Sequence, residues 1–211
     1  MALTGSLLVL FVFAHMLGNL KIFSGPQDIN VYARFLRELG QPELGYGEVL
    51  WLVRLILLAC VIVHLTAAFQ LTRLNWQARP REYRVKKHLA TTFASRTMPW
   101  GGAVLAAFVI FHLLHLTGGA IGFRPGQFRD LAVYQNVLIG FSFWPVVLLY
   151  VLAMASLGLH IDHGIWSAVQ TLGWGTARNE RSLKLLSRLI GFVAFLGFIT
   201  VPVSVFAGWL H

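Results

Sequence analysis

The sequence predicts an all-α integral membrane protein that forms one transmembrane domain over residues 1–211. Three observations lead to this prediction. Hydrophobic residues make up 57% of the chain and charged residues only 12%, which is about half the charge of an average soluble domain. Five apolar stretches are each long enough to cross a bilayer. The single cysteine, Cys60, excludes a disulfide framework and a four-cysteine metal site.

The five predicted transmembrane helices follow one another along the chain. Each covers at least the roughly 20 apolar residues that cross the hydrocarbon core at about 1.5 Å per residue. We do not expect the first stretch to be a cleavable signal peptide, because no basic region precedes it and His15 interrupts it. The predicted spans cover residues 2–23, 46–71, 98–116, 132–160 and 185–210.

The segments between the spans are of two kinds. Segment 24–45 is bounded by glycine and proline and includes a short amphipathic stretch, which we expect on the outer surface. Segment 74–97 is rich in tryptophan, tyrosine and phenylalanine, so we expect a structured loop on the inner face. Most of the 17 Lys and Arg residues lie in the second and fourth connections, whereas the first and third are nearly neutral.

The alternation of charge predicts an orientation. By the positive-inside rule, the basic connections and the N-terminus face the cytoplasm, and the C-terminus lies outside. We expect the membrane to be the bacterial cell membrane. This topology and contact with anionic lipid explain the net charge of +9 without a nucleic-acid partner.

Histidine is the residue type that points to chemistry within the spans. An ionisable side chain inside a membrane is a functional candidate by default, because it is costly there unless it is paired or ligated. Each of the first four spans contributes one histidine, at nearly equal spacing, and the fifth contributes none. These four residues are His15, His64, His112 and His160.

The topology sorts the four histidines into two pairs. His64 and His160 lie in the cytoplasmic halves of their spans, whereas His15 and His112 lie toward the outside. Two imidazoles from facing helices suit a six-coordinate b-type haem held inside a bundle. We therefore predict that the first four spans form a haem-binding four-helix bundle, with one haem at each depth.

Other interpretations of the histidines remain open. Zinc is disfavoured because only two histidines meet at each depth, and covalent c-type haem is excluded because no Cys-x-x-Cys-His motif is present. A single intramembrane histidine often serves only as an interhelical hydrogen-bond partner. His115 lies three residues after His112, and His163 three after His160, so either could replace its neighbour as a ligand.

The residues around these histidines resemble those of a known family. They are HMLGNL with His15, VHLTAAFQL with His64, FHLLHLTGG with His112 and LHIDHGIWSAVQTLGWG with His160. The chain is similar, over essentially its whole length, to the cytochrome b membrane anchor of succinate dehydrogenase and fumarate reductase, in its single-chain, five-helix, di-haem form. The most specific motif is His-x-x-x-Gly-Ile-Trp-Ser after the fourth span.

The resemblance implies ligands, partners and an activity. The first and third spans would hold the distal haem, and the second and fourth the haem near an iron–sulfur subunit. That subunit and a flavoprotein with FAD, which oxidises succinate, would bind the cytoplasmic face. Electrons would reach a membrane quinone, which we expect to be menaquinone. The sequence departs from some fumarate reductases at Gly158, where they carry a glutamate of a proton path, and this departure favours succinate oxidation.

Several cationic and polar residues are further candidates for cofactor binding. Arg54, inside span two, could bind a haem propionate or a quinone carbonyl; the alternatives are contact with the outer headgroups or an ion pair with Glu48 or Glu43. Arg73, Arg96 and Thr4 could hold propionates of the inner haem. No nucleophile–base arrangement is present, so we expect no catalytic residues beyond those that serve electron and proton transfer.

Two other functions are compatible with the same pattern. One is a di-haem cytochrome b subunit of another respiratory dehydrogenase, of the hydrogenase or formate dehydrogenase type. The other, from a different class, is a haem-free transporter that uses intramembrane histidines as a proton relay. Further oligomerisation is possible in each case.

Overall fold

The computed structural model describes residues 1–78 and 93–211, with side chains from residue 97 in the second range, and these residues form helices and no strand. The expected structured loop over 74–97 falls mostly on residues 79–92, which lie outside the described residues. The α-helices are α1 (Ala2–Leu20), α2 (Pro26–Glu38), α3 (Glu48–Gln77), α4 (Phe93–His112), α5 (Val133–Gly140), α6 (Trp144–Thr171) and α7 (Glu180–Phe206). A 3-10 turn (Lys21–Ser24) follows α1, and a π-helical turn (Leu113–Thr117) follows α4.

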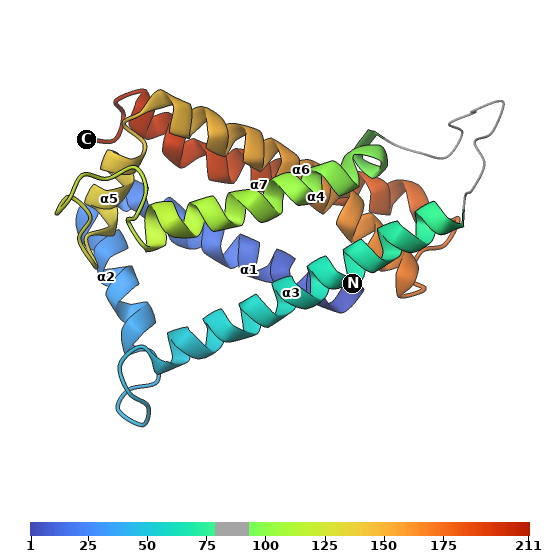
Figure 1. Ribbon diagram of the computed structural model, residues 1–211, viewed down its shortest axis with the longest axis horizontal. Helices are drawn as coiled ribbons and strands as arrows, with labels where there is room; N and C mark the ends of the chain where they lie inside the picture. The colour runs from blue at the N-terminus through green and yellow to red at the C-terminus, as the bar shows by residue number, and fades with distance from the viewer. Residues whose placement is uncertain (79–92) are drawn as a thin grey trace.

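Within the described ranges, five helices are long and apolar enough to cross a membrane. They are α1 with its 3-10 turn, α3, α4 with its π turn, α6 and α7. The C-terminus lies near one end of the long axis, and the N-terminus lies in the opposite half of the molecule (Figure 1). The prediction of five candidate membrane-spanning helices is therefore confirmed.

The fourth predicted span is wrong in its bounds. Residues 132–160 do not form one helix, because α5 ends at Gly140 and α6 begins only at Trp144. Pro145 lies in the first turn of α6, where a missing N–H is tolerated, whereas a proline in the interior of a helix breaks it. The spanning helix is therefore Trp144–Thr171 and ends eleven residues later than expected.

The helix α6 lies at the centre of the packing. It packs against α7, α4 and α1, whereas α3 packs mainly on α1 and α2. Cys60 is the one buried residue of α3, and this helix diverges from the others toward its start (Figure 1). The prediction of a bundle made of the first four spans left out α7. Among the described helices, the contact between α6 and α7 is the most extensive.

Two glycines allow α6 and α7 to approach closely. A Cβ atom at Gly158 would lie 3.0 Å from the backbone oxygen of Gly191. Small residues at such a crossing let the backbones of transmembrane helices touch. Position 158 is therefore part of a helix–helix contact, with no room for a large side chain.

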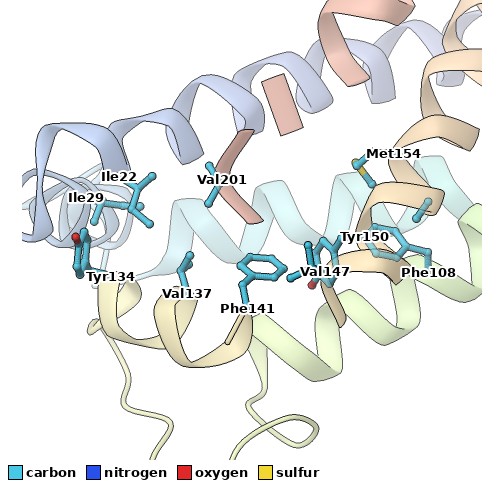
Figure 2. Packing of buried hydrophobic residues seen from close by; sticks show 11 residues of the cluster. Ile22, Ile29, Phe108, Tyr134, Val137, Phe141, Val147, Tyr150, Met154 and Val201 are labelled. Carbon is cyan, nitrogen blue, oxygen red and sulfur yellow. The ribbon is translucent and has the colours of Figure 1, made fainter. Parts of the chain in front are cut away.

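A buried apolar cluster connects the end that carries α2 and α5 with the middle of the bundle (Figure 2). Within it, the rings of Phe141 and Tyr150 meet edge to face, with their centroids 4.7 Å apart, an arrangement that aromatic pairs prefer. Phe108 packs against the same tyrosine at 4.9 Å. The ring of Tyr150 is therefore held between aromatic neighbours. The labelled members are Ile22, Ile29, Phe108, Tyr134, Val137, Phe141, Val147, Tyr150, Met154 and Val201.

Candidate cofactor-binding site

The first pair of histidines joins α1 to α4. The ring centroids of His15 and His112 are 5.9 Å apart and their planes meet at 78°. His15 stacks on Phe11, one turn earlier on α1, at 5.4 Å, and His112 stacks on Phe108 at 5.9 Å. The two imidazoles, which we call the α1–α4 pair, are thus supported by aromatic rings from their own helices.

The second pair joins α3 to α6. The ring centroids of His64 and His160 are 6.2 Å apart, with an angle of 57° between the planes; we call them the α3–α6 pair. Glycines from the other two helices lie beside these rings. A Cβ atom at Gly5 of α1 would lie 3.4 Å from Cε1 of His64, and one at Gly102 of α4 would lie 3.8 Å from Cε1 of His160. The space next to this pair is therefore bordered by residues without side chains.

The two pairs lie at different levels of the bundle. Tyr150 contacts the α1–α4 pair, and His160 of the other pair is ten residues further along α6. Thr4 contacts the α3–α6 pair, and His15 is eleven residues further along α1. At about 1.5 Å per residue, both helices place the pairs about 15 Å apart along the bundle, roughly half of the hydrocarbon thickness.

The spacing within each pair suits a shared metal ion. A bond from a metal to an imidazole nitrogen is about 2 Å long, and the ring centre lies about 1 Å further out. Two imidazoles on opposite sides of one metal ion therefore have centroids about 6 Å apart, close to the separations of both pairs. Among the described residues, no group of three or more His, Cys, Asp or Glu side chains could hold a metal ion.

A threonine determines which nitrogen of His64 carries its proton. The hydroxyl of Thr4 donates to the carbonyl of Met1 at 3.1 Å and lies 3.3 Å from Nδ1 of His64. A hydroxyl has one hydrogen, so with that hydrogen given to Met1 its oxygen can only accept from the histidine. In that arrangement Nδ1 of His64 is the donor, and the lone pair of Nε2 is free, which is the tautomer that histidines in metal sites usually adopt.

The structure separates the alternatives that the sequence left open in the third span. His112 faces His15, whereas His115 is fully buried and turned toward Phe123 and Phe141, with ring centroids 5.6 and 6.0 Å away. Nδ1 of each of the two histidines in this span lies within hydrogen-bond distance of the hydroxyl of Tyr150. The ring opposite His15 is therefore that of His112.

In the fourth span, His160 is the histidine that faces α3. Of the ring contacts formed by the described residues, the one between α3 and α6 involves His160 and not His163. Nδ1 of His160 is buried and has no hydrogen-bond partner in the described part of the chain. A cavity of about 280 Å³ opens beside this ring, between α4 and α6, and its wall includes Trp100, Gly101 and Ser156.

Neither Arg54 nor Arg73 forms a hydrogen bond, ion pair or ring contact with a histidine pair in the described part of the chain. The guanidinium of Arg54 stacks over the indole of Trp51 at 4.9 Å, and neither of its expected acidic partners forms an ion pair with it in the described residues. Arg73 is exposed on the last turns of α3. The side chain of Arg96 lies outside the described residues. Thr4, predicted to bind a propionate, contacts His64 directly instead.

The sequence analysis missed three residues of this site. Tyr150 contacts two histidines, and Gly5 and Gly102 border the α3–α6 pair. The signal for Tyr150 was its position in the middle of an apolar stretch, because a buried tyrosine hydroxyl usually has a hydrogen-bond partner. The two glycines carry no such signal, since glycine is common in transmembrane helices.

Comparison of the chain with protein-family models, with curated proteins and with solved structures found no match in any of the three.

Proposed function

We propose that this chain is the cytochrome b membrane-anchor subunit of a succinate:quinone oxidoreductase and that its two histidine pairs bind two b-type haems. The observation that supports this best is the pair geometry: two sets of facing imidazoles, with centroids 5.9 and 6.2 Å apart, at two levels of one bundle. Neutral imidazole nitrogen is a donor that iron accepts readily. The sequence motifs around the same four histidines point to the same family.

In this proposal, His15 and His112 hold the outer haem and His64 and His160 the inner one. When bound, a haem with two axial imidazoles supplies one-electron transfer. With its hydrogen donated to Met1, Thr4 favours the tautomer of His64 in which Nε2 is unprotonated and open to iron. The glycines beside the α3–α6 pair leave room for a flat group. Arg54 and Arg73 remain candidates for binding propionates from the outer and inner sides.

The proposal includes an orientation. Four basic residues lie in the first turns of α7 and just before it, which suits the cytoplasmic face. There the basic segments would dock the iron–sulfur subunit, which is joined to the flavoprotein with FAD that oxidises succinate. A membrane quinone, menaquinone in our proposal, accepts the electrons. The basic residues are Arg178, Arg181, Lys184 and Arg188.

Gly158 bears on the direction of the reaction. Its contact with Gly191 leaves no space for an acidic side chain at this position. A proton path that uses a carboxylate here, as in some fumarate reductases, is therefore not part of the proposal. The direction we propose is oxidation of succinate and reduction of quinone.

The test is to purify the complex from its host membrane and to count its haems by optical spectroscopy. We expect succinate to reduce b-type haem in the wild-type complex. His64→Leu should remove one haem and His112→Leu the other, whereas the control His163→Leu should retain both. A wild-type preparation without haem would refute the proposal and favour a transporter. Haem without a flavoprotein and without reduction by succinate would refute the assignment to succinate oxidation and favour another dehydrogenase.

A further inference from the structure

His115 is the least explained polar residue in the bundle. Its side chain is 0% exposed, and it lies in the π-helical turn that ends the fourth helix, a kind of turn that is frequent at functional sites. Cβ atoms at Gly122 and Gly140 would lie 2.9 Å from ring atoms of His115, and Phe111 stacks on the ring at 5.4 Å. The imidazole is thus held in one place.

The hydroxyl of Tyr150 lies between two imidazoles. It is 3.1 Å from Nδ1 of His112 and 3.0 Å from Nδ1 of His115. A phenol has one hydrogen, so it can donate to only one of these nitrogens, and when it does, the other contact is a hydrogen bond only if that ring donates its own N–H to the phenol oxygen. The three side chains therefore have two hydrogen-bond directions in which the tyrosine hydroxyl is used as a donor.

Only one direction leaves His112 able to bind a metal through Nε2. In that direction, Nδ1–H of His112 donates to Tyr150, and the hydroxyl of Tyr150 donates to Nδ1 of His115. In the reverse direction, His112 accepts at Nδ1 and carries its proton on Nε2, where it blocks ligation. In the first direction, His115 accepts the tyrosine hydrogen at Nδ1 and carries its own proton on Nε2, which has no hydrogen-bond partner among the described residues.

We infer that His115 and Tyr150 are positioning residues for the outer haem, acting as a buried hydrogen-bond chain that sets the tautomer of His112. This inference rests on the proposed function, because it assigns His112 as a ligand. Neither residue is a ligand in it. Hydrogen bonds to the outer nitrogen of a ligating histidine fix the orientation of the ring and raise its basicity.

The hydrogen-bond chain through Tyr150 predicts a result that simple packing does not. Without His115, the buried hydroxyl of Tyr150 has His112 as its remaining acceptor, so the blocking tautomer is favoured. Without the hydroxyl, His112 has no hydrogen-bond partner in either tautomer, so the balance between them changes little. Removal of His115 should therefore weaken the outer haem more than removal of the hydroxyl, and the second change should rescue the first.

The experiment measures the rate of haem transfer from the purified complex to apomyoglobin, with the haem of the α3–α6 pair as the internal control. We expect Tyr150→Phe to speed loss of the outer haem about tenfold and His115→Leu to speed it toward about a hundredfold, the two ends of the usual effect of losing a partner on a ligating histidine. The double variant should behave like Tyr150→Phe. His115→Asn, which keeps an acceptor near the position of Nδ1, should lie close to the wild type.

Redox potentiometry gives a second readout. Tyr150→Phe should raise the midpoint potential of the outer haem, because His112 loses an acceptor that makes it electron-rich, and should leave the other haem unchanged. The inference is overturned if the effects of His115→Leu and Tyr150→Phe add in the double variant, or if neither changes the outer haem. If the wild type binds no haem at all, the proposed function fails rather than this hydrogen-bond chain alone.

Discussion

Replacement of Thr4 by valine tests the assignment of hydrogen-bond donor and acceptor between Thr4 and His64 in the α3–α6 pair. The substitution keeps the branched shape of the side chain and removes the oxygen that accepts from His64. Loss of a partner on the outer nitrogen of a ligating histidine typically lowers metal affinity about 10- to 100-fold. The contact here is 3.3 Å long and only part-buried, so the low end applies: about tenfold, or about 1.4 kcal/mol.

The assay is the rate of loss of the inner haem to apomyoglobin, and Thr72→Val is the matched control. Thr72 is also a part-buried threonine, but its hydroxyl donates to the carbonyl of Ala68 in its own helix. We expect Thr4→Val to speed loss of the inner haem about tenfold and Thr72→Val to leave it unchanged. Equal rates for the wild type and both variants would refute the assignment of Nδ1 as the protonated nitrogen of His64.

Three further predictions concern charge, packing and topology. Arg73→Gln should lower the midpoint potential of the inner haem alone. The reason is that a cation near a haem propionate shifts the potential upward, so its removal shifts the potential downward. Potentiometry of both haems checks this, and an unchanged potential would exclude Arg73 from the site. Gly158→Ala should destabilise the protein by about 1–3 kcal/mol through overpacking at the α6–α7 crossing. The control Gly164→Ala should not, because the space around the Cβ position of Gly164 is open. Unfolding in detergent mixtures measures the stability of both variants, and equal stabilities would contradict the close contact. In a variant without the native cysteine, a cysteine at Ser182 should be labelled only from the cytoplasmic side and one at His211 only from outside; the opposite pattern would reverse the proposed orientation.

The sequence predicted the helices well where apolar length alone decides them. The helix Glu48–Gln77 has no proline or glycine inside it, so its existence as a spanning helix was clear, although it begins two residues later and ends six residues later than the predicted bounds. The fourth stretch failed because its hydropathy continues across Phe141 and Ser142, although the helix does not. Hydropathy does not report where a helix is interrupted. Pro145 was the signal that indicated an interruption before it.

The histidine pairs were predictable because their spacing along the chain reflects alternating directions across the membrane. The depth of each residue therefore followed from the charged connections. Contacts that depend on side-chain direction did not follow, and these include the hydroxyls of Thr4 and Tyr150 and the different directions of His112 and His115. The close packing of α7 on α6 was also missed, because it depends on Gly158 and Gly191 rather than on any apolar periodicity.

The number of haems bound by the wild-type chain tests the central claim most directly. The protein would be purified from haem-replete cells, and the ratio of haem to protein would be combined with an electron paramagnetic resonance spectrum of the oxidised form. The account predicts two haems per chain, both low-spin with two imidazole ligands. A colourless protein, or one whose haems carry a ligand other than histidine, would contradict it.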